Sequence, residues 1–376
     1  MANETGISLE TCFEDIPDPR VEGRCEHLLI EVLIIAVCAV ITGAEGWVEV
    51  ETFGKAKESW LKTFLKLPGG IPAHDTFGRI FAAIDGEAFS KGFARWVEGT
   101  FPVTDGQVVA IDGKTMRGSE DAWRSKSAIH RVSAWAHESG LVLGQYKVDE
   151  KSNEITAIPA LLRLLDVSGC IVTIDAMGCQ TAIAQTSRDE KADDVLAVKD
   201  NQKHLYQDLK DWFVYADQQG LSAPSCTYAE TVNHGRIEIR RCWAINDPRA
   251  FDVIRHYDGW ADLHSIVRVY RERRTGDTVQ HETSYYISSL PNDAAHLLHC
   301  IRAHWSIENS LHWVLDVTFN EDDSRVRLAN SPQNMAFLPH LALNILKSDS
   351  SKGSLRQKRY KAALDDSFLT HLIAHF

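Results

Sequence analysis

Two apolar runs that each end in an aspartate constrain the fold of this chain more than any other feature. The stretch "VVAIDGKTMRG" places the apolar residues 108–111 before Asp112, and "CIVTIDAMGCQ" places 171–174 before Asp175. Short apolar runs bounded in this way predict buried strands. A charge at the end of such a strand must be paired, hydrated or metal-bound, because burying it bare is very costly. The sequence therefore predicts two strands that each deliver one aspartate.

Length and composition indicate an ordinary globular protein. The chain has 376 residues, which suffices for a large core and more than one structural unit. Its eight cysteines form no CxxC pair, so we expect free thiols in a reducing compartment. No basic-then-apolar signal sequence opens the chain, and the apolar run 32–41 is too short to span a bilayer. These features predict a cytoplasmic protein with a buried core helix at 27–47 and no membrane segment.

The charge distribution argues against a generic nucleic-acid binder but leaves room for a local basic groove. The net charge is −12, whereas such binders usually carry a basic excess. Basic residues concentrate at 347–361, with six Lys or Arg against one Asp, and at "RERR" (271–274) and "RIEIRR" (236–241). Each concentration, taken alone, is more typical of a solvated surface.

The pattern of elements changes near residue 106. Residues 1–105 are expected to form an N-terminal helical domain, as consistent with a DNA-binding helix-turn-helix-like unit as with a helical cap. From 106 to 224 the apolar patterns alternate in the order β-β-β-α-β-α-β-α. This order fits an α/β mixed sheet with three antiparallel strands followed by right-handed crossovers. It resembles the ribonuclease H-like fold, in which the first and fourth strands are neighbours, so Asp112 and Asp175 are expected side by side at one sheet edge.

The remaining sequence is expected to complete this catalytic core. Residues 225–290 predict a β-rich insertion with a hairpin turning at "TGD", 291–346 the final core helices, and 347–376 a basic C-terminal tail. In the helix predicted after Asp293, His304, Glu308 and His312 recur every four residues and share one face with apolar residues. Glu308 is therefore expected to point inward, toward the sheet. Before Asp112 and Asp175 are considered, a salt bridge to a buried arginine is the less favoured alternative.

Three converging carboxylates indicate a metal site. At about 4 Å and an effective dielectric near 20, each like-charge pair costs roughly 4 kcal/mol, so the cluster must take up protons or bind cations. Oxygen-only ligation suits Mg²⁺ or Mn²⁺ and not zinc. Two such ions activate a nucleophile and stabilise the leaving oxygen in phosphodiester cleavage and strand transfer.

Several stretches together identify a family resemblance that runs from residue 15 to 323. They are "DIPDPR", "GIPAHDTFGRIF", "AIDGKTMRGS", "HRVSAWA", "KSNEITAIPALL", "VTIDAMGCQ", "LAVKDNQ", "HGRIEIRR" and "HWSIENSLHWVLDVTFNED". With these motifs the chain resembles the DDE-type insertion-sequence transposases of bacteria, in the group that includes the H-repeat-associated proteins. The resemblance implies Asp112, Asp175 and Glu308 as catalytic and metal-binding residues. It also implies Mg²⁺ or Mn²⁺ as cofactor, terminal inverted repeats and target DNA as partners, and a homo-multimer on DNA.

The resemblance leaves the DNA contacts open, because the wider group carries a Tyr, an Arg and a Lys around its glutamate. Here Ile301, His304 and Leu315 occupy those positions. The remaining candidates for DNA contact are Lys114, Arg117, Lys199, Asn201, Gln202, Arg302, His304 and His312. Structural salt bridges are an equal alternative for the first two, whereas DNA contact is favoured over loop capping for the next three.

Other polar and aromatic residues receive structural interpretations. Glu154 is expected to begin a helix, with a role beside the site as the alternative. His130 and His234 are expected to be structural or DNA-facing rather than metal ligands, and Trp305 and Trp313 to pack on their helix.

Two other functions compete with transposition. A catalytically inactive or domesticated DNA-binding relative would be expected to have lost part of the triad, and all three carboxylates are intact. A zinc hydrolase built on His304, Glu308 and His312 would require the HExxH spacing, whereas the spacing here is His-x3-Glu-x3-His.

Overall fold

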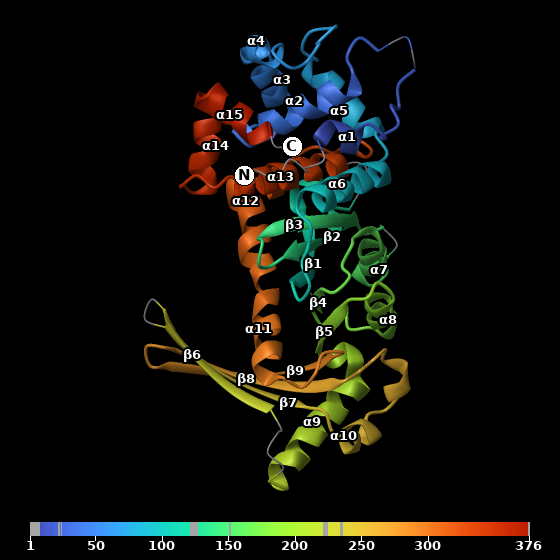
Figure 1. Ribbon diagram of the computed structural model, residues 1–376, viewed down its shortest axis with the longest axis vertical. Helices are drawn as coiled ribbons and strands as arrows, with labels where there is room; N and C mark the ends of the chain where they lie inside the picture. Colours follow the sequence, from blue (N-terminus) through green and yellow to red (C-terminus); the bar gives the residue numbers. More distant parts are fainter. Residues whose placement is uncertain are drawn as a thin grey trace.

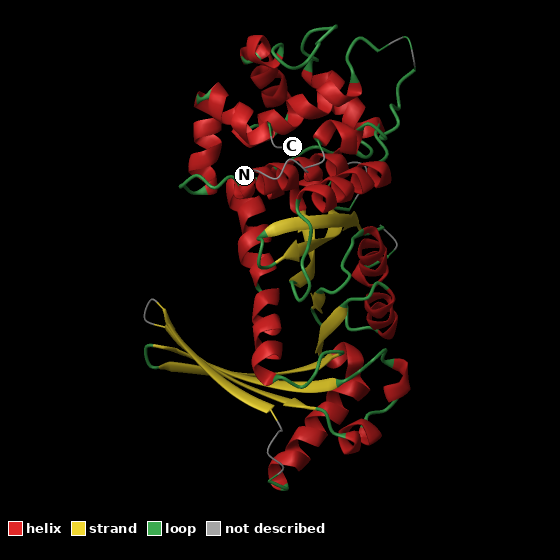
Figure 2. Ribbon diagram, viewed as in Figure 1, coloured by secondary structure: helices red, strands yellow, loops and turns green. Residues whose placement is uncertain are grey.

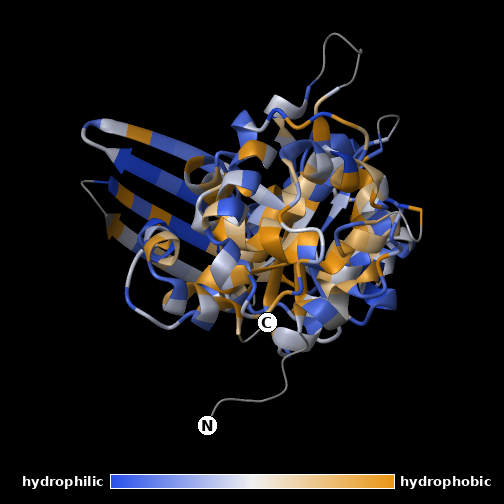
Figure 3. Ribbon diagram, turned by 90° about the horizontal axis from the view of Figure 1, so that it is seen from above, coloured by the Kyte–Doolittle hydropathy of each residue, from blue (hydrophilic) through white to orange (hydrophobic). Residues whose placement is uncertain are grey.

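The computed structural model describes residues 8–21, 23, 25–120, 127–149, 152–220, 225–233 and 236–374. A helical unit, a central sheet and an extended strand-rich arm follow one another along the long axis of the molecule (Figures 1 and 2). Seen along that axis, apolar residues gather in the interior, while the free end of the arm is largely hydrophilic (Figure 3).

The central sheet has the predicted ribonuclease H-like order. Its core strands are β1 (Val108–Met116), β2 (Ile129–Ala136), β3 (Leu141–Lys147), β4 (Ile171–Ile174) and β5 (Asp193–Val198). They lie in the order β3-β2-β1-β4-β5, with β1 antiparallel to β2 and parallel to β4. The crossovers run through α7 (Glu154–Leu164) and α8 (Thr181–Asp189), and α9 (Lys203–Gln218) follows β5. The predicted mixed α/β fold and its strand order are confirmed.

The strand-rich segment extends this same sheet instead of forming a separate one. Its strands are β6 (Ser225–Asn233), β7 (Arg236–Ile245), β8 (Ser265–Thr275) and β9 (Thr278–Ser288), with α10 (Pro248–Val253) between β7 and β8. β9 pairs antiparallel with β5, and the sheet continues outward as β8, β7 and β6. The β8–β9 hairpin turns at the expected "TGD", and the arm projects well beyond the core (Figure 1).

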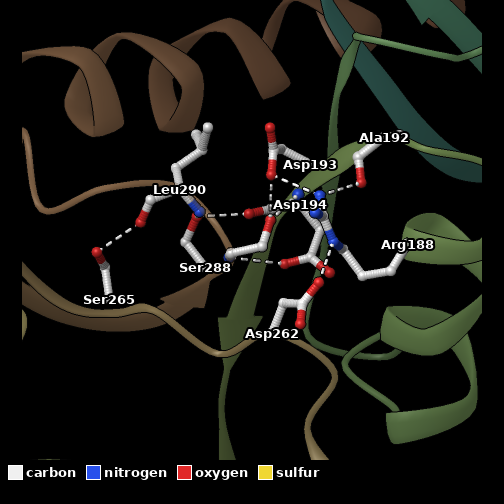
Figure 4. A network of polar contacts seen from close by, with 9 residues as sticks. Arg188, Ala192, Asp193, Asp194, Asp262, Ser265, Ser288 and Leu290 are labelled. Atoms are coloured by element: carbon white, nitrogen blue, oxygen red, sulfur yellow. Dashed lines mark hydrogen bonds and ion pairs between the residues drawn. The ribbon is translucent and has the colours of Figure 1, made fainter.

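A buried polar network joins this arm to the core (Figure 4). The Ser288 hydroxyl on β9 donates to the carbonyl of Asp194 on β5 at 2.5 Å, and the Ser289 hydroxyl donates to Asp193 at 2.8 Å. Arg188 on α8 donates to Asp193 at 2.6 Å and to Asp262 at 2.9 Å. The Asp194 carboxylate is buried, and burial raises its pKa to about 7.

Both ends of the chain contribute to the helical unit. Its N-terminal helices are α1 (Leu9–Phe13), α2 (Leu29–Thr42), α3 (Trp47–Ala56), α4 (Glu58–Leu61), α5 (His74–Ala83) and α6 (Gly86–Thr100). The long helix α13 (Ser331–Ser348) packs against α2, α5, α6 and strand β3. Its buried Asn344 amide pairs with both the N–H and the C=O of Val142, at 2.9 and 2.8 Å. A side chain thus takes the place of a neighbouring strand along part of edge strand β3.

The C-terminal segment differs from the predicted basic tail. It forms α14 (Leu355–Leu364) and α15 (Asp366–Ile373), which pack against α13, and α14 also contacts α2. Lys358 and Arg359 are buried and donate to the carbonyls of Leu346 and Val40, at 3.2 and 3.1 Å. Charge runs identify a tail only when the charges are solvated, and here long side chains bury their stems and use helix-end carbonyls as acceptors. The remaining domain boundaries stay predictions.

Among the described residues, no single helix is long and apolar enough to cross a membrane. Helices α2 and α3 meet that test only as a pair, with a bend of 95° between them. The apolar residues of α2, such as Val32, Ile35 and Ile41, are fully buried in the helical unit.

The long helix predicted after Asp293 is divided into three parts. These are α11 (Ala294–His304), a π-helical turn (Glu308–His312) and α12 (Trp313–Phe319). α11 crosses the sheet and contacts strands of both the core and the arm. Short 3-10 turns occur at Arg117–Ser119, Asp200–Gln202, Tyr257–Gly259 and Glu321–Asp323.

The Asp194 network generates a prediction about pH. The folded protein keeps a proton on Asp194 up to about pH 7, whereas the unfolded chain loses it near its ordinary value of 3.8. The folded state therefore binds more protons between these values, and this carboxyl makes stability fall as pH rises from about 4 to about 7. Asp194→Asn should remove that fall. At pH 8 the variant should be more stable than wild type by on the order of 2–4 kcal/mol, and the difference should vanish near pH 4.

Denaturant unfolding between pH 4 and pH 8 measures this effect. Asp211→Asn, an exposed position on α9, is the control and should follow the wild-type profile. Equal loss of stability for Asp194→Asn at every pH would show that the site holds a charged carboxylate.

Candidate active site

The register of β1 and β4 brings the two predicted aspartates to one sheet edge. Ile111 lies opposite Ile174 in the parallel pair, so Asp112 and Asp175 follow at the same level. Both line a cavity of about 400 Å³ whose wall also contains Glu308. Further lining residues come from β5, the arm and α11, and they include Lys199, Arg271, Glu282, His304 and Trp305. Residues far apart in sequence therefore share one concave site.

Glu308 is one of the residues that line this cavity. Its neighbours Leu297, Ile301, Leu311 and Leu315 are buried, as the helical spacing predicted. Glu308 itself is exposed, which differs from the expected inward position among apolar side chains. It begins the π-helical turn, a deviation that places one extra residue in a turn and that occurs frequently at functional sites. The turn leaves Glu308 on the cavity wall while the residues around it stay packed.

Burial and neighbouring acidic groups raise the pKa of Asp112. Its pKa is raised to about 7, first by burial and then by the charges of Asp175, Glu154 and Glu308, against a lowering contribution from the Gly113 N–H. A carboxyl with this pKa holds its proton more readily than an ordinary aspartate unless a cation approaches. Asp175 is held differently, because its Oδ1 accepts the N–H groups of Met177 and Gly178 at 3.0 and 3.3 Å.

Two histidines flank the carboxylates. His312 Nδ1 lies 3.5 Å from Asp112 Oδ2, and burial, with the charges of Arg131, Lys114 and His304, lowers the His312 pKa to about 3. The imidazole is therefore neutral. His304 Nδ1 lies 3.1 Å from the Thr173 hydroxyl, and burial lowers the His304 pKa. The two rings thus face different partners, on β1 and β4.

The basic residues that follow Asp112 take different positions. Lys114 is buried, and its Nζ lies 2.5 Å from Asp316 and 3.4 Å from Asp322, which matches the salt-bridge alternative. The Arg117 side chain is 85% exposed and lies 3.8 Å from Asp322. Only Arg117 of this pair presents its charge to solvent.

Of the candidate residues that follow β5, two bind backbone carbonyls of the protein and one is exposed to solvent. Asn201 Nδ2 donates to the Ala176 carbonyl at 2.5 Å, and Gln202 Nε2 donates to the Cys179 carbonyl at 2.9 Å. These amides hold the loop that carries Asp175, so their geometry is that of the loop-capping alternative. Lys199 is exposed and lines the cavity beside the carboxylates. Arg302 is exposed on α11, next to the arm.

A fourth carboxylate lies close behind Asp112. Glu154 begins α7, as predicted, and its Oε1 lies 2.6 Å from His130 Nε2. The other ring nitrogen of His130 lies 2.8 Å from the Thr115 hydroxyl. A Cβ at Gly113 would lie 2.0 Å from Glu154 Oε1, so the close approach requires glycine there. The position of Glu154 is therefore compatible with both sequence-based interpretations, a helix start and a role beside the site.

The remaining sequence-based interpretations have mixed outcomes. Trp305 and Trp313 are 46% and 57% exposed, so neither is packed as expected, and Trp305 lines the cavity. His234 lies outside the described residues.

The carboxylate oxygens that line the cavity are suitable ligands for a hard divalent cation. The cavity offers carboxylate oxygens in excess of cations near Asp112, and Mg²⁺ and Mn²⁺ prefer such oxygens. Within the described residues, no three His, Cys, Asp or Glu side chains are close enough to form a complete metal site. The carboxylates would therefore have to draw together around an ion, with Asp112, Asp175 and Glu308 as the groups that face the cavity.

Comparison with known proteins places these residues in a family. A family model described as "Transposase DDE domain" matches residues 104–345, and one described as "DDE_Tnp_1-associated" matches residues 10–97. "Putative transposase YncI" of Escherichia coli O157:H7 is 42% identical over 96% of this chain and 92% of its own length. "H repeat-associated putative transposase YhhI" of Escherichia coli K12 is 39% identical over 96% of both chains.

A solved structure, the piggyBac transposase synaptic complex with hairpin DNA, aligns with 94% of this chain and 75% of its own. The sequence identity is 10% and the TM-score 0.42.

The Asp112 pKa leads to a prediction about metal binding. Because the carboxyl must lose its proton to bind an ion, Mg²⁺ or Mn²⁺ affinity should rise about tenfold per pH unit up to about pH 7 and then level off. Binding at pH 6 should release about one proton. Isothermal titration calorimetry in buffers of different ionisation enthalpy measures both quantities.

The controls separate this carboxyl from others. Asp112→Asn should abolish the proton release, whereas Asp194→Asn, which removes a second carboxyl with a pKa near 7 outside the cavity, should retain it. Wild-type affinity that is equal at pH 6 and pH 8 would contradict the prediction.

Proposed function

Because this chain belongs to the DDE transposase family, we propose that it cuts DNA at the ends of an insertion sequence and joins the 3′ hydroxyls to target DNA. The observation that carries the proposal is the shared cavity of Asp112, Asp175 and Glu308. Two of these carboxylates come from adjacent strands of a ribonuclease H-like sheet and the third from a helix that crosses it. The proposed partners are the terminal inverted repeats and the target DNA, bound by a multimer of this chain.

Divalent ions would supply the activation of water or a 3′ hydroxyl and the stabilisation of the leaving oxygen. Asp112, Asp175 and Glu308 would hold these ions. Asp175 is positioned by two backbone N–H groups, and Asp112 by strand β1 and the neutral His312 ring. Because His312 carries no charge, it orients Asp112 without competing with a cation for the carboxylate.

The chain's own residues also determine how DNA would approach. The exposed Lys199 lines the cavity together with the acidic residues, and its ammonium would bind a phosphate next to the reacting bond. We therefore propose that Lys199 binds the substrate and that the carboxylates hold the ions.

Cleavage of the element's own end DNA with Mg²⁺ tests the proposal. Asp112→Asn, Asp175→Asn and Glu308→Gln should each reduce nicking and strand transfer by roughly a hundredfold or more, since each removes one ligand charge from the transition-state site. Asp194→Asn, which removes a buried carboxyl from the joint of the sheet, should retain activity at neutral pH. Metal-dependent nicking that persists in all three cavity variants would refute the assignment.

A further inference from the structure

Three arginines gather where the arm meets α11. Arg240 on β7 lies directly opposite Arg271 on β8, and Arg302 on α11 lies next to them. Like charges directly opposite on paired strands destabilise a sheet. Their pairing is therefore a cost to the free protein, and an anion would remove it.

The acids nearby neutralise this cluster only in part. Arg240 is paired with Glu238, but Glu238 is shared with Arg236 at 3.0 Å and Arg273 at 3.4 Å. Arg271 is paired with Glu282, whose side chain is half exposed. Arg302 makes no hydrogen bond or ion pair with any part of the chain that the structure describes. The strand pairing places this group on the α11 side of the sheet, with more arginines than carboxylates.

The Arg240 guanidinium has spare donor capacity. Its Nη1 is buried and has no hydrogen-bond partner among the described residues. Burial lowers the pKa of Arg240, and the charges of Arg302 and Arg271 lower it further, against the raising effect of Glu238. A buried N–H of a charged group that lacks a partner is costly, so this donor indicates a missing acceptor.

The cluster is continuous with the cavity. Arg271 lines the cavity with Asp112 and Glu308, and its guanidinium lies over the Trp305 ring, 5.6 Å from the ring centroid. Trp305 is three residues before Glu308. A strand that reaches the carboxylates would therefore continue past Arg271 toward Arg302.

From this arrangement we infer that Arg240, Arg271 and Arg302 bind consecutive phosphates of the DNA strand that leaves the catalytic cavity along the arm. Guanidinium groups suit this role, because their planar fork matches phosphate oxygens and their charge does not titrate. The inference rests on the proposed function for the direction of the strand. It assigns phosphate binding to the α11 side of the arm and not to its other face.

Binding of the full chain to a fluorescein-labelled 30-base-pair duplex of arbitrary sequence tests the inference. Phosphate contacts are independent of sequence, and EDTA keeps cleavage out of the measurement. In the double variant Arg271→Gln/Arg302→Gln, the salt slope of log affinity should shrink by about two, and affinity at 100 mM salt should fall roughly tenfold or more. The double variant Arg271→Lys/Arg302→Lys should recover part of the affinity, because it keeps both positive charges and loses the planar guanidinium fork.

Arg241→Gln is the matched control. Arg241 is adjacent to Arg240 but points to the opposite face of β7, and it is exposed. Arg241→Gln should reduce the salt slope of log affinity by less than half of the reduction expected for replacing one of the three cluster arginines. If the double variant keeps the wild-type slope, or loses no more than Arg241→Gln, the inference is wrong. This result is separable from the proposed function, because Mg²⁺-dependent cleavage by the carboxylate variants is scored in a different assay.

Discussion

The parallel pairing of β1 with β4 is the constraint on which the rest of the structure depends. It sets Ile111 opposite Ile174, so Asp112 and Asp175 emerge together, and a slip of one residue would turn one of them to the other face. Six large apolar residues in the paired segments 108–111 and 171–174 are buried, each contributing about 1.5–3 kcal/mol. This gain exceeds the roughly 4 kcal/mol cost of one like-charge pair at an effective dielectric near 20. The core can therefore force two carboxylates together, and the pKa of Asp112 is raised first by its burial and then by the repulsion that remains.

A buried polar layer on the far side of Asp112 keeps this edge rigid. Arg131, opposite Lys114 on the β1–β2 pair, forms an ion pair with Glu321 in which both side chains are nearly inaccessible. Lys114 binds Asp316 on α12, and His312 reaches Asp112. Removing one partner of a buried ion pair strands the other charge at a cost of about 3–5 kcal/mol. The layer therefore ties the helix that carries Glu308 to the strand that carries Asp112, even though the two lie almost 200 residues apart in sequence.

Sequence patterns predicted the elements that depend on local periodicity. The β-β-β-α-β-α-β-α order, the β1–β4 neighbourhood and the "TGD" hairpin follow from apolar runs and turn residues, and the structure has them. The four-residue spacing around Glu308 predicted an uninterrupted α-helix. It could not predict the π-helical turn, because such a turn depends on tertiary contacts that residue spacing does not reveal. The roles of Asn201 and Gln202, which bind loop carbonyls, were hidden for the same reason. The opposition of Arg240 and Arg271 depends on strand register, which neither "RIEIRR" nor "RERR" reveals alone.

The charge distribution explains why these separate features belong to one site. A chain with a net charge of −12 and an acidic cavity repels DNA, so attraction must come from a local excess of cations. The arm supplies part of that excess at the cavity wall, through Arg271. A DNA strand held there would bring a negatively charged phosphate close to the negatively charged carboxylates. This approach is favourable only when divalent ions neutralise the carboxylates. Ions and DNA would then each raise the affinity for the other by the same factor, as linkage requires. An arm built as a continuation of the catalytic sheet gives this coupling a fixed geometry, since residues Val195–Val198 of β5 pair with β9 of the arm and Lys199 follows directly after them.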